Sequence, residues 1–154
     1  VMSNSSAKFW QPDVTVATVV VRDGLLLMVE ENAAGSVVLN QPAGHLEPDE
    51  SIFQAAVRET LEETGWHVEL THFIGAYQWK APENGQHYLR MAFSAKPLHV
   101  EENYQLDDGI IAAHWLSPSE ISDNRSMHRS PLVWKLVEDY LAGQRYPLQA
   151  IHAL

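Results

Sequence analysis

The apolar residues near the start of the chain fall into short runs divided by turn-forming residues. A β-hairpin over Val14 to Glu31 is predicted, because the runs "DVTVATVVV" and "LLLMVEEN" flank an Asp-Gly turn. A short strand is predicted within "GSVVLNQPAG", which Pro42 and Gly44 should end. Three more strands are predicted by the later runs "HVELTHFIGAYQW", "HYLRMAFSAKPL" and "IIAAHWL".

The clearest helical signal lies between these groups of strands. Ser51, with Gln54 three positions later, has the spacing of a capping box. We therefore predict a helix from Ser51 to Thr64, with Gly65 as the left-handed residue that follows it. One arc of this helix is expected to be its buried face, and it holds Phe53, Val57, Thr60, Leu61 and Thr64.

Two further helices are predicted near the end of the chain. Ser117, followed by Pro118, is typical of the first residues of a short helix. A last helix from about Pro131 to Ala142 should stop at Gly143. Its apolar side carries Leu132, Leu136, Val137, Tyr140 and Leu141.

This order of elements favours an α/β fold, in which a mixed β-sheet carries a helix on each face. A length of 154 residues predicts one domain over residues 1–154, with residues 1–12 as a lead-in. That lead-in lacks the basic flank and apolar centre of a signal peptide. Its Phe9 and Trp10 are expected to pack onto the core.

Composition and charge narrow the possible functions. The apolar share of 45% is that of a globular protein, and a net charge of −10 argues against broad binding to nucleic acid or to anionic membranes. The chain has no cysteine, so disulfides and thiolate metal sites are excluded and a cytoplasmic location is expected. The longest apolar run, "VTVATVVV", is too short to span a bilayer.

The predicted helix over Ser51 to Thr64 carries an unusual concentration of acids. Glu59, Glu62 and Glu63 are spaced so that they lie within one arc, where like charges repel one another. A divalent cation such as Mg²⁺ would offset that repulsion, because carboxylate oxygens suit hard ions. For adjacent glutamates alone, a solvated helix face is the more common explanation.

The spacing of residue types over the longer stretch from Gly44 to Trp66 favours a metal site. Gly44, five residues, Glu50, seven residues and Arg58-Glu59 are followed by Glu62-Glu63, Gly65 and an apolar Trp66. Such a combination is expected by chance in on the order of one in a million chains of this length.

The stretch "GHLEPDESIFQAAVRETLEETGW", residues 44–66, resembles the Nudix box, the signature of hydrolases that act on nucleoside diphosphates linked to another group. Thr60, where the family usually has an aliphatic residue, is a soft departure. The resemblance implies an α/β/α sandwich in which the box forms a loop-helix-loop beside a mixed sheet. It also implies a Mg²⁺ ion, or Mn²⁺ in its place, held by Glu59, Glu62 and Glu63, with a carbonyl ligand from Ala43 or Gly44. Arg58 is expected to orient these glutamates and to pair with Glu50.

The stretches "LNQPAGHLEPDE", "HFIGAYQW", "RSPLV" and "GQRYPL" are similar to the NudJ-type branch of bacterial phosphatases. That branch implies release of orthophosphate from nucleoside di- and triphosphates and from thiamin diphosphate. One alternative keeps the fold but cleaves ADP-ribose or a dinucleotide internally. Another is a nucleotide-binding module without turnover. Whether the protein is a monomer or a homodimer stays open.

Cleavage of a phosphoanhydride also needs a base to take a proton from water. Glu63 is the first choice within the box. Among the loop acids, Asp107 and Asp108 are preferred to Glu101 and Glu102, because they precede the strand "IIAAHWL" and a loop there could swing over the site. For each loop acid, a solvated residue without a catalytic role is the alternative.

Several residues outside the box are candidates for binding the substrate. Arg90 alternates with apolar neighbours and could meet a phosphate or form a structural salt bridge. Trp79 and Tyr77 share a strand face and could stack on a flat ring or pack in the core. His45 could donate to a terminal phosphate. For Arg129 and Arg145 the alternatives are phosphate binding and a structural role, as a helix cap or a salt bridge.

Overall fold

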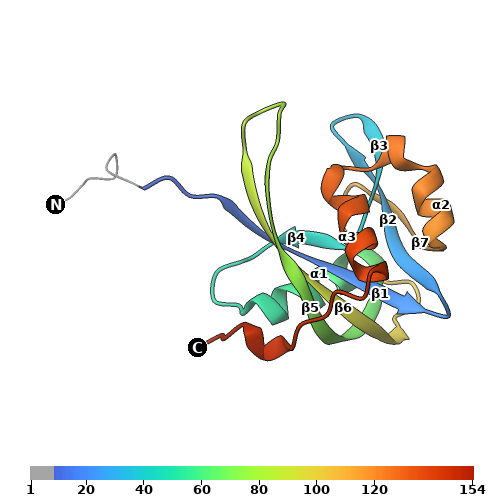
Figure 1. The fold of residues 1–154 in the computed structure, drawn as a ribbon. Helices are drawn as coiled ribbons and strands as arrows, with labels where there is room; N and C mark the ends of the chain where they lie inside the picture. Colours follow the sequence, from blue (N-terminus) through green and yellow to red (C-terminus); the bar gives the residue numbers. More distant parts are fainter. Residues whose placement is uncertain (1–8) are drawn as a thin grey trace.

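The computed structural model describes residues 9–154, so most of the predicted lead-in, residues 1–8, lies outside the described part. Two layers of helix enclose a strongly twisted sheet (Figure 1). The mixed α/β architecture predicted from the sequence is confirmed. In chain order the elements are β1 Asp13–Arg22, β2 Leu25–Ala33, β3 Ser36–Asn40, β4 Ala43–His45, α1 Ile52–Thr64, β5 Trp66–Lys80, β6 His87–Val100, β7 Ile110–Leu116, α2 Pro118–Asp123, η2 Arg125–Met127, α3 Pro131–Leu141 and η3 Leu148–Ala150.

The sheet consists of two halves that meet at the turn between β1 and β2. These strands pair only next to that turn, at Val21 with Leu26 and at Arg22 with Leu25. Beyond it β1 pairs in parallel with β6 and antiparallel with β4, whereas β2 pairs with β3 and β7. The predicted hairpin is therefore correct in its bounds, but its two strands separate because each has other partners.

The local signals for α1 are confirmed by its ends. Ser51 accepts a hydrogen bond from the backbone N–H of Gln54, whose side chain accepts one from the Ser51 N–H. After the helix, Gly65 takes the left-handed conformation, with φ of 78°. The helix is packed over more of its surface than predicted. Its buried residues are Ala55, Ala56, Glu59, Thr60 and Thr64, whereas Phe53, Val57 and Leu61 are only half-buried.

The two faces of β1 pack against different helices, because successive side chains of a strand point to opposite sides. Val16 belongs to an apolar cluster with Ala55 and Ala56 of α1 and with Phe93. Ala17 and Val19 belong to a second cluster that includes α3. Ser130 caps α3, as Ser117 caps α2. The buried side of α3 consists of Leu132, Val133, Leu136, Val137 and Asp139, so the predicted Leu141 is exposed and Val133 takes its place.

A short strand, β4, was not predicted. Pro42 does end β3, but Gly44 lies inside β4 instead of stopping a strand. Residues 43–45 are extended because they pair with β1, with Gly44 opposite Val16. The pairing brings the start of the Nudix-like stretch against the centre of the sheet.

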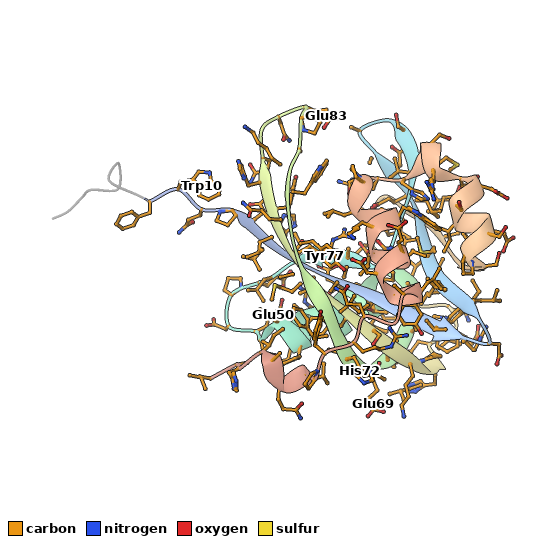
Figure 2. The ribbon with its side chains drawn as sticks, in the orientation of Figure 1. Trp10, Glu50, Glu69, His72, Tyr77 and Glu83 are labelled. Atoms are coloured by element: carbon orange, nitrogen blue, oxygen red, sulfur yellow. The ribbon has the colours of Figure 1, made fainter. Side chains whose placement is uncertain are left out.

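Two aromatic residues at the start of the described chain do not reach the core. Phe9 is 90% exposed and Trp10 is 66% exposed, so the prediction that they pack onto the core is wrong. Trp10 instead meets His87 edge to face, with ring centroids 4.9 Å apart. His87 belongs to the β5–β6 hairpin, which projects beyond the rest of the sheet and carries Glu83 near its tip (Figure 2).

The end of the chain runs along β5 (Figure 1). The backbone N–H of Phe73 donates to the carbonyl of Tyr146 at 2.9 Å, and the Tyr146 N–H donates back at 2.8 Å. Gln144 adds a side-chain hydrogen bond to the carbonyl of Ile74. In the described part of the chain, no helix has both the length and the apolar character that crossing a membrane requires.

Candidate active site

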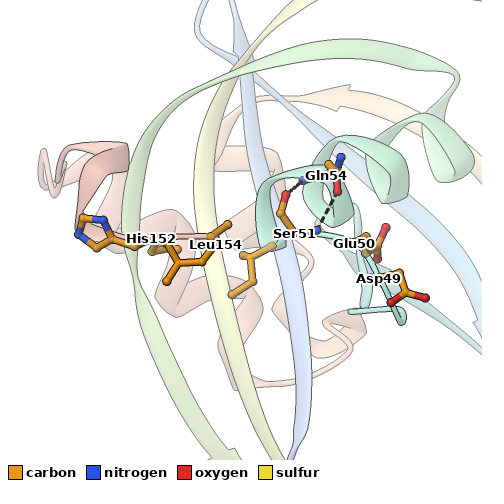
Figure 3. A pocket seen from close by; sticks show the side chains of 9 residues that line it. Asp49, Glu50, Ser51, Gln54, His152 and Leu154 are labelled. Carbon is orange, nitrogen blue, oxygen red and sulfur yellow. Dashed lines mark hydrogen bonds between the residues drawn. The ribbon is translucent and has the colours of Figure 1, made fainter.

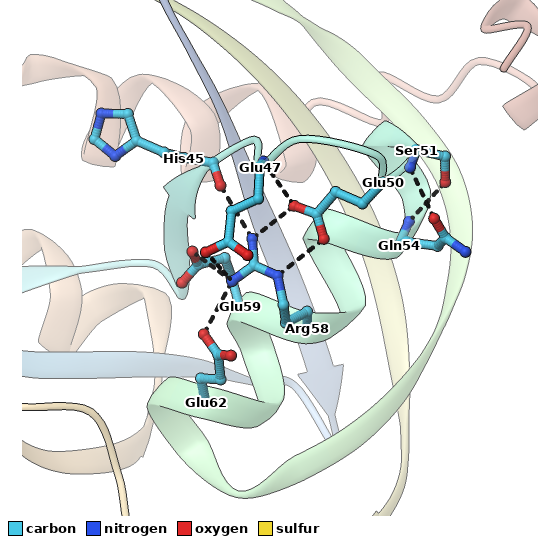
Figure 4. Close-up of polar contacts among 8 residues, drawn as sticks. All are labelled: His45, Glu47, Glu50, Ser51, Gln54, Arg58, Glu59 and Glu62. Carbon is cyan, nitrogen blue, oxygen red and sulfur yellow. Dashed lines mark hydrogen bonds and ion pairs between the residues drawn. The ribbon is translucent and has the colours of Figure 1, made fainter.

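Arg58 is the centre of the polar contacts on α1 (Figure 4). Its Nε and Nη2 donate to the two carboxylate oxygens of Glu50 at 2.9 and 2.7 Å, which confirms the predicted pairing. Its Nη1 donates to Glu59 at 3.0 Å and to Glu62 at 2.9 Å, and its Nη2 to the carbonyl of His45 at 3.0 Å. The hydrogen bonds with Glu50 raise the pKa of Arg58 and lower the pKa of Glu50. Arg58 thus fixes the positions of two acids on its own helix.

Glu59 is buried although it carries a charge, with only 9% of the residue exposed. Burial raises the pKa of its carboxyl group, and Arg58 acts in the opposite direction. The backbone of Gly44 lies directly against this carboxylate, since a Cβ atom on Gly44 would stand 2.1 Å from the carboxyl carbon. Only glycine permits this approach of β4 to α1.

Glu63 lies one helical turn after Glu59. It accepts a hydrogen bond from the backbone N–H of Ala43 at 3.0 Å. Burial is the main cause that raises the pKa of Glu63 to about 8, and the charges of Glu59, Glu31 and Asp107 act in the same direction. A cation bound among these acids would lower it again.

Asp107 reaches the helix from the loop between β6 and β7. Its backbone N–H donates to the carbonyl of Glu62 at 3.0 Å. At the start of the same loop, the N–H of Glu101 donates to the carbonyl of Gly65 at 2.8 Å. The loop is therefore fastened to the last turn of α1, which argues against the predicted swinging motion.

Glu59, Glu63 and Asp107 form an acid cluster, in which one carboxylate oxygen of each lies within 4.8 Å of the others. Three acids so close together repel unless a positive charge stands between them. Oxygen donors of this kind suit hard divalent cations, and the cluster fits such an ion. Ala43 and Gly44, the predicted carbonyl ligands, lie beside it in β4.

Two predicted acids lie outside this cluster within the described part of the chain. Glu62 turns toward Arg58, and its carboxylate is about one-third exposed. Asp108 is exposed, one position beyond Asp107. The spacing of the helix therefore brings two of the three box glutamates together, and the loop adds one of its two aspartates.

Arg90, a predicted phosphate ligand, is buried in the sheet and only 6% exposed. It donates to the side-chain oxygens of Gln41 at 3.2 Å and Asn40 at 3.4 Å. Neither amide was recognised as a site residue from the sequence. The available signal was a pair of polar residues, Asn40 at the end of the apolar strand "SVVLN" and Gln41 directly after it.

The aromatic candidates divide between two roles. The Tyr77 hydroxyl donates to Asp139 of α3 at 2.7 Å, and its ring packs against the core, which favours the packing alternative. Trp79 lies farther out on the hairpin and stacks beside Tyr88, with centroids 5.9 Å apart and planes 21° apart. Tyr88 was missed because only pairing between strands brings it beside Trp79.

The remaining basic candidates have local partners. His45 is exposed, and its Nε2 lies 3.4 Å from Asp13. Arg129 binds Glu31 at 2.9 Å, so the salt-bridge alternative is the one observed. Arg145 lies over the ring of Tyr140 and donates to the carbonyl of Tyr140 in the last turn of α3, as a helix cap does, and to the carbonyl of Gln144 beyond it.

Residues 11–135 match the family model of the NUDIX domain. The chain belongs to the Nudix family. As a Nudix chain it is 42% identical over 142 residues to Phosphatase NudJ of Escherichia coli (strain K12), a match that covers 92% of each protein.

Solved structures agree with this membership. A NUDIX hydrolase from Nitrosomonas europaea is 47% identical, with a TM-score of 0.92 over 94% of this chain and 98% of the other. An ADP-ribose pyrophosphatase from Streptococcus suis has a TM-score of 0.65 over 88% of this chain and 96% of the other, and at 16% identity it shares the fold alone. This chain is accordingly a Nudix hydrolase that acts on phosphoanhydrides. Nudix enzymes generally use a divalent metal, and the acid cluster is suited to one.

A separate hollow lies at the first turn of α1 (Figure 3). Gln54 and Ser51 form one wall, and the last residues of the chain, including His152 and Leu154, form the other. None of the three acids of the cluster lines it. The hollow is therefore not the place where this Nudix site would hold its ion.

Proposed function

We propose that this Nudix hydrolase uses Mg²⁺, or Mn²⁺ in its place, to release orthophosphate from nucleoside di- and triphosphates and from thiamin diphosphate. The observation that carries the proposal is the convergence of Glu59, Glu63 and Asp107 within 4.8 Å beside the side-chain-free Gly44. The relative from Escherichia coli is named a phosphatase, which supports orthophosphate as the product.

Glu59 and Glu63 are the metal ligands that the geometry supports best, with Asp107 as the third carboxylate. A divalent ion at that place neutralises phosphate oxygens and lowers the pKa of water. Glu62 stays a predicted ligand. To reach the ion it would have to change its side-chain rotamer, because Arg58 holds its carboxylate. Carbonyl oxygens of Ala43 or Gly44 complete the proposed set.

Glu63 is the proposed general base. It belongs to the acid cluster beside the proposed ion, and the Ala43 N–H holds one of its carboxylate oxygens in place. Asp107 is the alternative, whereas Asp108 has less support because it lies outside the acid cluster. Arg58 acts as a positioning residue, because its hydrogen bonds hold Glu59 and Glu62.

Residues outside the box are proposed to bind the rest of the substrate. Arg90 would meet a phosphate, and Trp79 would offer a ring for a nucleobase or a thiazolium. His45, at the exposed end of β4, would donate to a terminal phosphate. Tyr77 has the weakest support as a ligand, because its hydroxyl is occupied by Asp139.

The test is a substrate panel with identification of the products, in which nucleoside di- and triphosphates, thiamin diphosphate, ADP-ribose and a dinucleotide are each incubated with Mg²⁺. Orthophosphate from the first three classes supports the proposal. Release of AMP from ADP-ribose or the dinucleotide would instead favour the internal pyrophosphatase. Binding of Mg²⁺ and nucleotide without turnover on the whole panel would favour a module that only binds.

A glutamate variant tests the assignment within the site. Glu63→Gln should lower kcat by about 100-fold or more, which is the usual contribution of a general base. Glu138→Gln, on the exposed side of α3, changes the net charge equally and should leave kcat unchanged. Near-full activity of Glu63→Gln would remove Glu63 from the reaction.

A further inference from the structure

A pair of histidines lies where β5 begins and β6 ends. His67 and His99 are direct partners across these antiparallel strands, so their side chains leave the same face of the sheet. Their rings stack, with centroids 4.4 Å apart and planes 21° apart. This end of the strand pair lies near Glu69, away from the tip of the projecting hairpin (Figure 2). Two imidazoles so close together can offer two nitrogen ligands to one metal ion.

A carboxylate orients one of the two rings. The Nε2 atom of His67 lies 2.7 Å from a carboxylate oxygen of Glu101. Because a carboxylate oxygen accepts, Nε2 is the donor, and Nδ1 of the neutral ring keeps its lone pair. Histidines that bind metal ions usually donate their other ring N–H to such a carboxylate, which makes the ligand nitrogen more basic. His67 therefore already has the supporting partner that a metal ligand needs.

Glu101 is held in place by its own backbone. Its N–H donates to the carbonyl of Gly65 at 2.8 Å, and Gly65 is the left-handed residue that ends α1. The side chains of His67 and Glu101 are 31% and 48% exposed, and His99 is exposed as well. An ion can therefore reach the histidine pair directly from solvent.

The ligands of this pair differ in chemistry from those of the acid cluster. Carboxylate oxygens suit Mg²⁺, whereas imidazole nitrogens suit Zn²⁺, Cu²⁺ and Ni²⁺. Within the described residues, the acid cluster is the group that brings three ligand atoms within 4.8 Å, so the histidine pair supplies two ligands and Glu101 supplies none. A tetrahedral Zn²⁺ ion holds two nitrogens about 3.3 Å apart, which the stacked rings reach by tilting toward each other.

We propose that His67 Nδ1 and a ring nitrogen of His99 bind one transition-metal ion, with Zn²⁺ as the representative ion. Glu101 is a positioning residue that acts through His67, and water completes the coordination. Because Glu101 begins the loop that carries Asp107, the bound ion fastens the ends of β5 and β6 where that loop starts. The site shares no residue with the acid cluster and does not depend on the proposed function.

The test is a calorimetric titration of the full chain with Zn²⁺, in excess Mg²⁺ to occupy oxygen ligands, at about pH 7.5, where a free imidazole is neutral. One Zn²⁺ ion should bind to each chain. Loss of a partner that only supports a metal ligand costs about 10- to 100-fold in affinity, so Glu101→Gln should weaken binding by about tenfold. His99→Ala removes a ligand and should weaken it by about 100-fold or more.

His72→Ala is the matched control, because His72 is an exposed histidine of the same strand. It should leave the affinity for Zn²⁺ unchanged. Zn²⁺ should raise the unfolding temperature of the wild type and of His72→Ala but not of His99→Ala, since an ion stabilises only a chain that binds it. Absence of Zn²⁺ binding by the wild type, or equal affinity in the wild type and His99→Ala, overturns the proposal.

Nitrogen NMR of the histidine rings tests the role of Glu101 separately. Zn²⁺ should shift the Nδ1 signal of His67 in the wild type, because Nε2 is occupied by Glu101. Zn²⁺ bound through Nε2 of His67 instead would refute Glu101 as the residue that orients the ring.

Discussion

Gly44 shows how a single missing side chain shapes the site. A methyl group at this position would overlap the carboxylate of Glu59, because its carbon would be 2.1 Å from the carboxyl carbon. Gly44→Ala should therefore push Glu59 away from the acid cluster and weaken binding of Mg²⁺ by about 10- to 100-fold, as loss of a supporting contact usually does. Calorimetric titration with Mg²⁺ measures the change.

The control for Gly44→Ala uses the same substitution in a Glu59→Ala background. There the added methyl group has no carboxylate to displace, so its effect on thermal stability should largely disappear. If Gly44→Ala lowers stability equally in both backgrounds, the close approach to Glu59 is not the cause.

Asp107 and Asp108 offer a matched pair of neighbouring acids. Both are exposed, but Asp107 belongs to the acid cluster and Asp108 does not. Asp107→Asn should weaken Mg²⁺ binding by about tenfold or more, and Asp108→Asn should leave it unchanged. Calorimetric titration of both variants with Mg²⁺ measures the two affinities. Equal losses of Mg²⁺ affinity would show that only the net charge of the loop matters.

The predictability of single residues from the sequence depended on how local their geometry is. Glu59 and Glu63 could be placed on one side of a helix because helical spacing is fixed by the backbone. Asp107 is 44 positions beyond Glu63 and meets it through a hydrogen bond between a loop and a helix end. No periodic pattern records such a contact, and the same applies to Gln41 beside Arg90.

At the scale of elements, caps and turn residues located the helix ends well. The capping box at Ser51, the left-handed Gly65 and the cap at Ser117 are all present. Strand β4 escaped prediction because three residues carry no periodicity, and only pairing with β1 makes them extended.

The connection between α2 and α3 should respond to pH. His128 is partly buried there, and its Nε2 donates to the carbonyl of Ile121 at 2.9 Å. Burial, and to a lesser degree Arg125, lowers the pKa of His128 in the folded protein. Below about pH 6.5 the unfolded chain takes up the proton first, so stability should fall as the pH is lowered through this window.

His128→Gln removes this titration. The variant should lose less stability than the wild type between about pH 7.5 and about pH 5.5, as measured by urea unfolding. His152→Gln, at an exposed position, should behave like the wild type. An identical pH dependence in His128→Gln and the wild type would contradict the assignment.

At the scale of the whole molecule, the candidate site lies where the two halves of the sheet come together. Arg90 belongs to β6 in one half, whereas Asn40 and Glu31 belong to β3 and β2 in the other. The acids of α1 pack beside the first half, and Asp107 arrives on the loop that leads into β7 of the second. Sequence patterns predicted the strands of both halves except β4. They did not predict the separation of the halves, because that follows from competition among partners for β1 and β2.

The segment that follows α3 has a consequence for how copies of this protein behave in a crowded solution. The free edge of a sheet invites pairing with another molecule. Along β5, Tyr146 already occupies the backbone groups of Phe73, and Gln144 covers the carbonyl of Ile74. A chain shortened after Gly143 should therefore self-associate into larger particles. Light scattering would detect them. A truncated chain that stays monodisperse would show that these last residues are not what keeps neighbouring molecules apart.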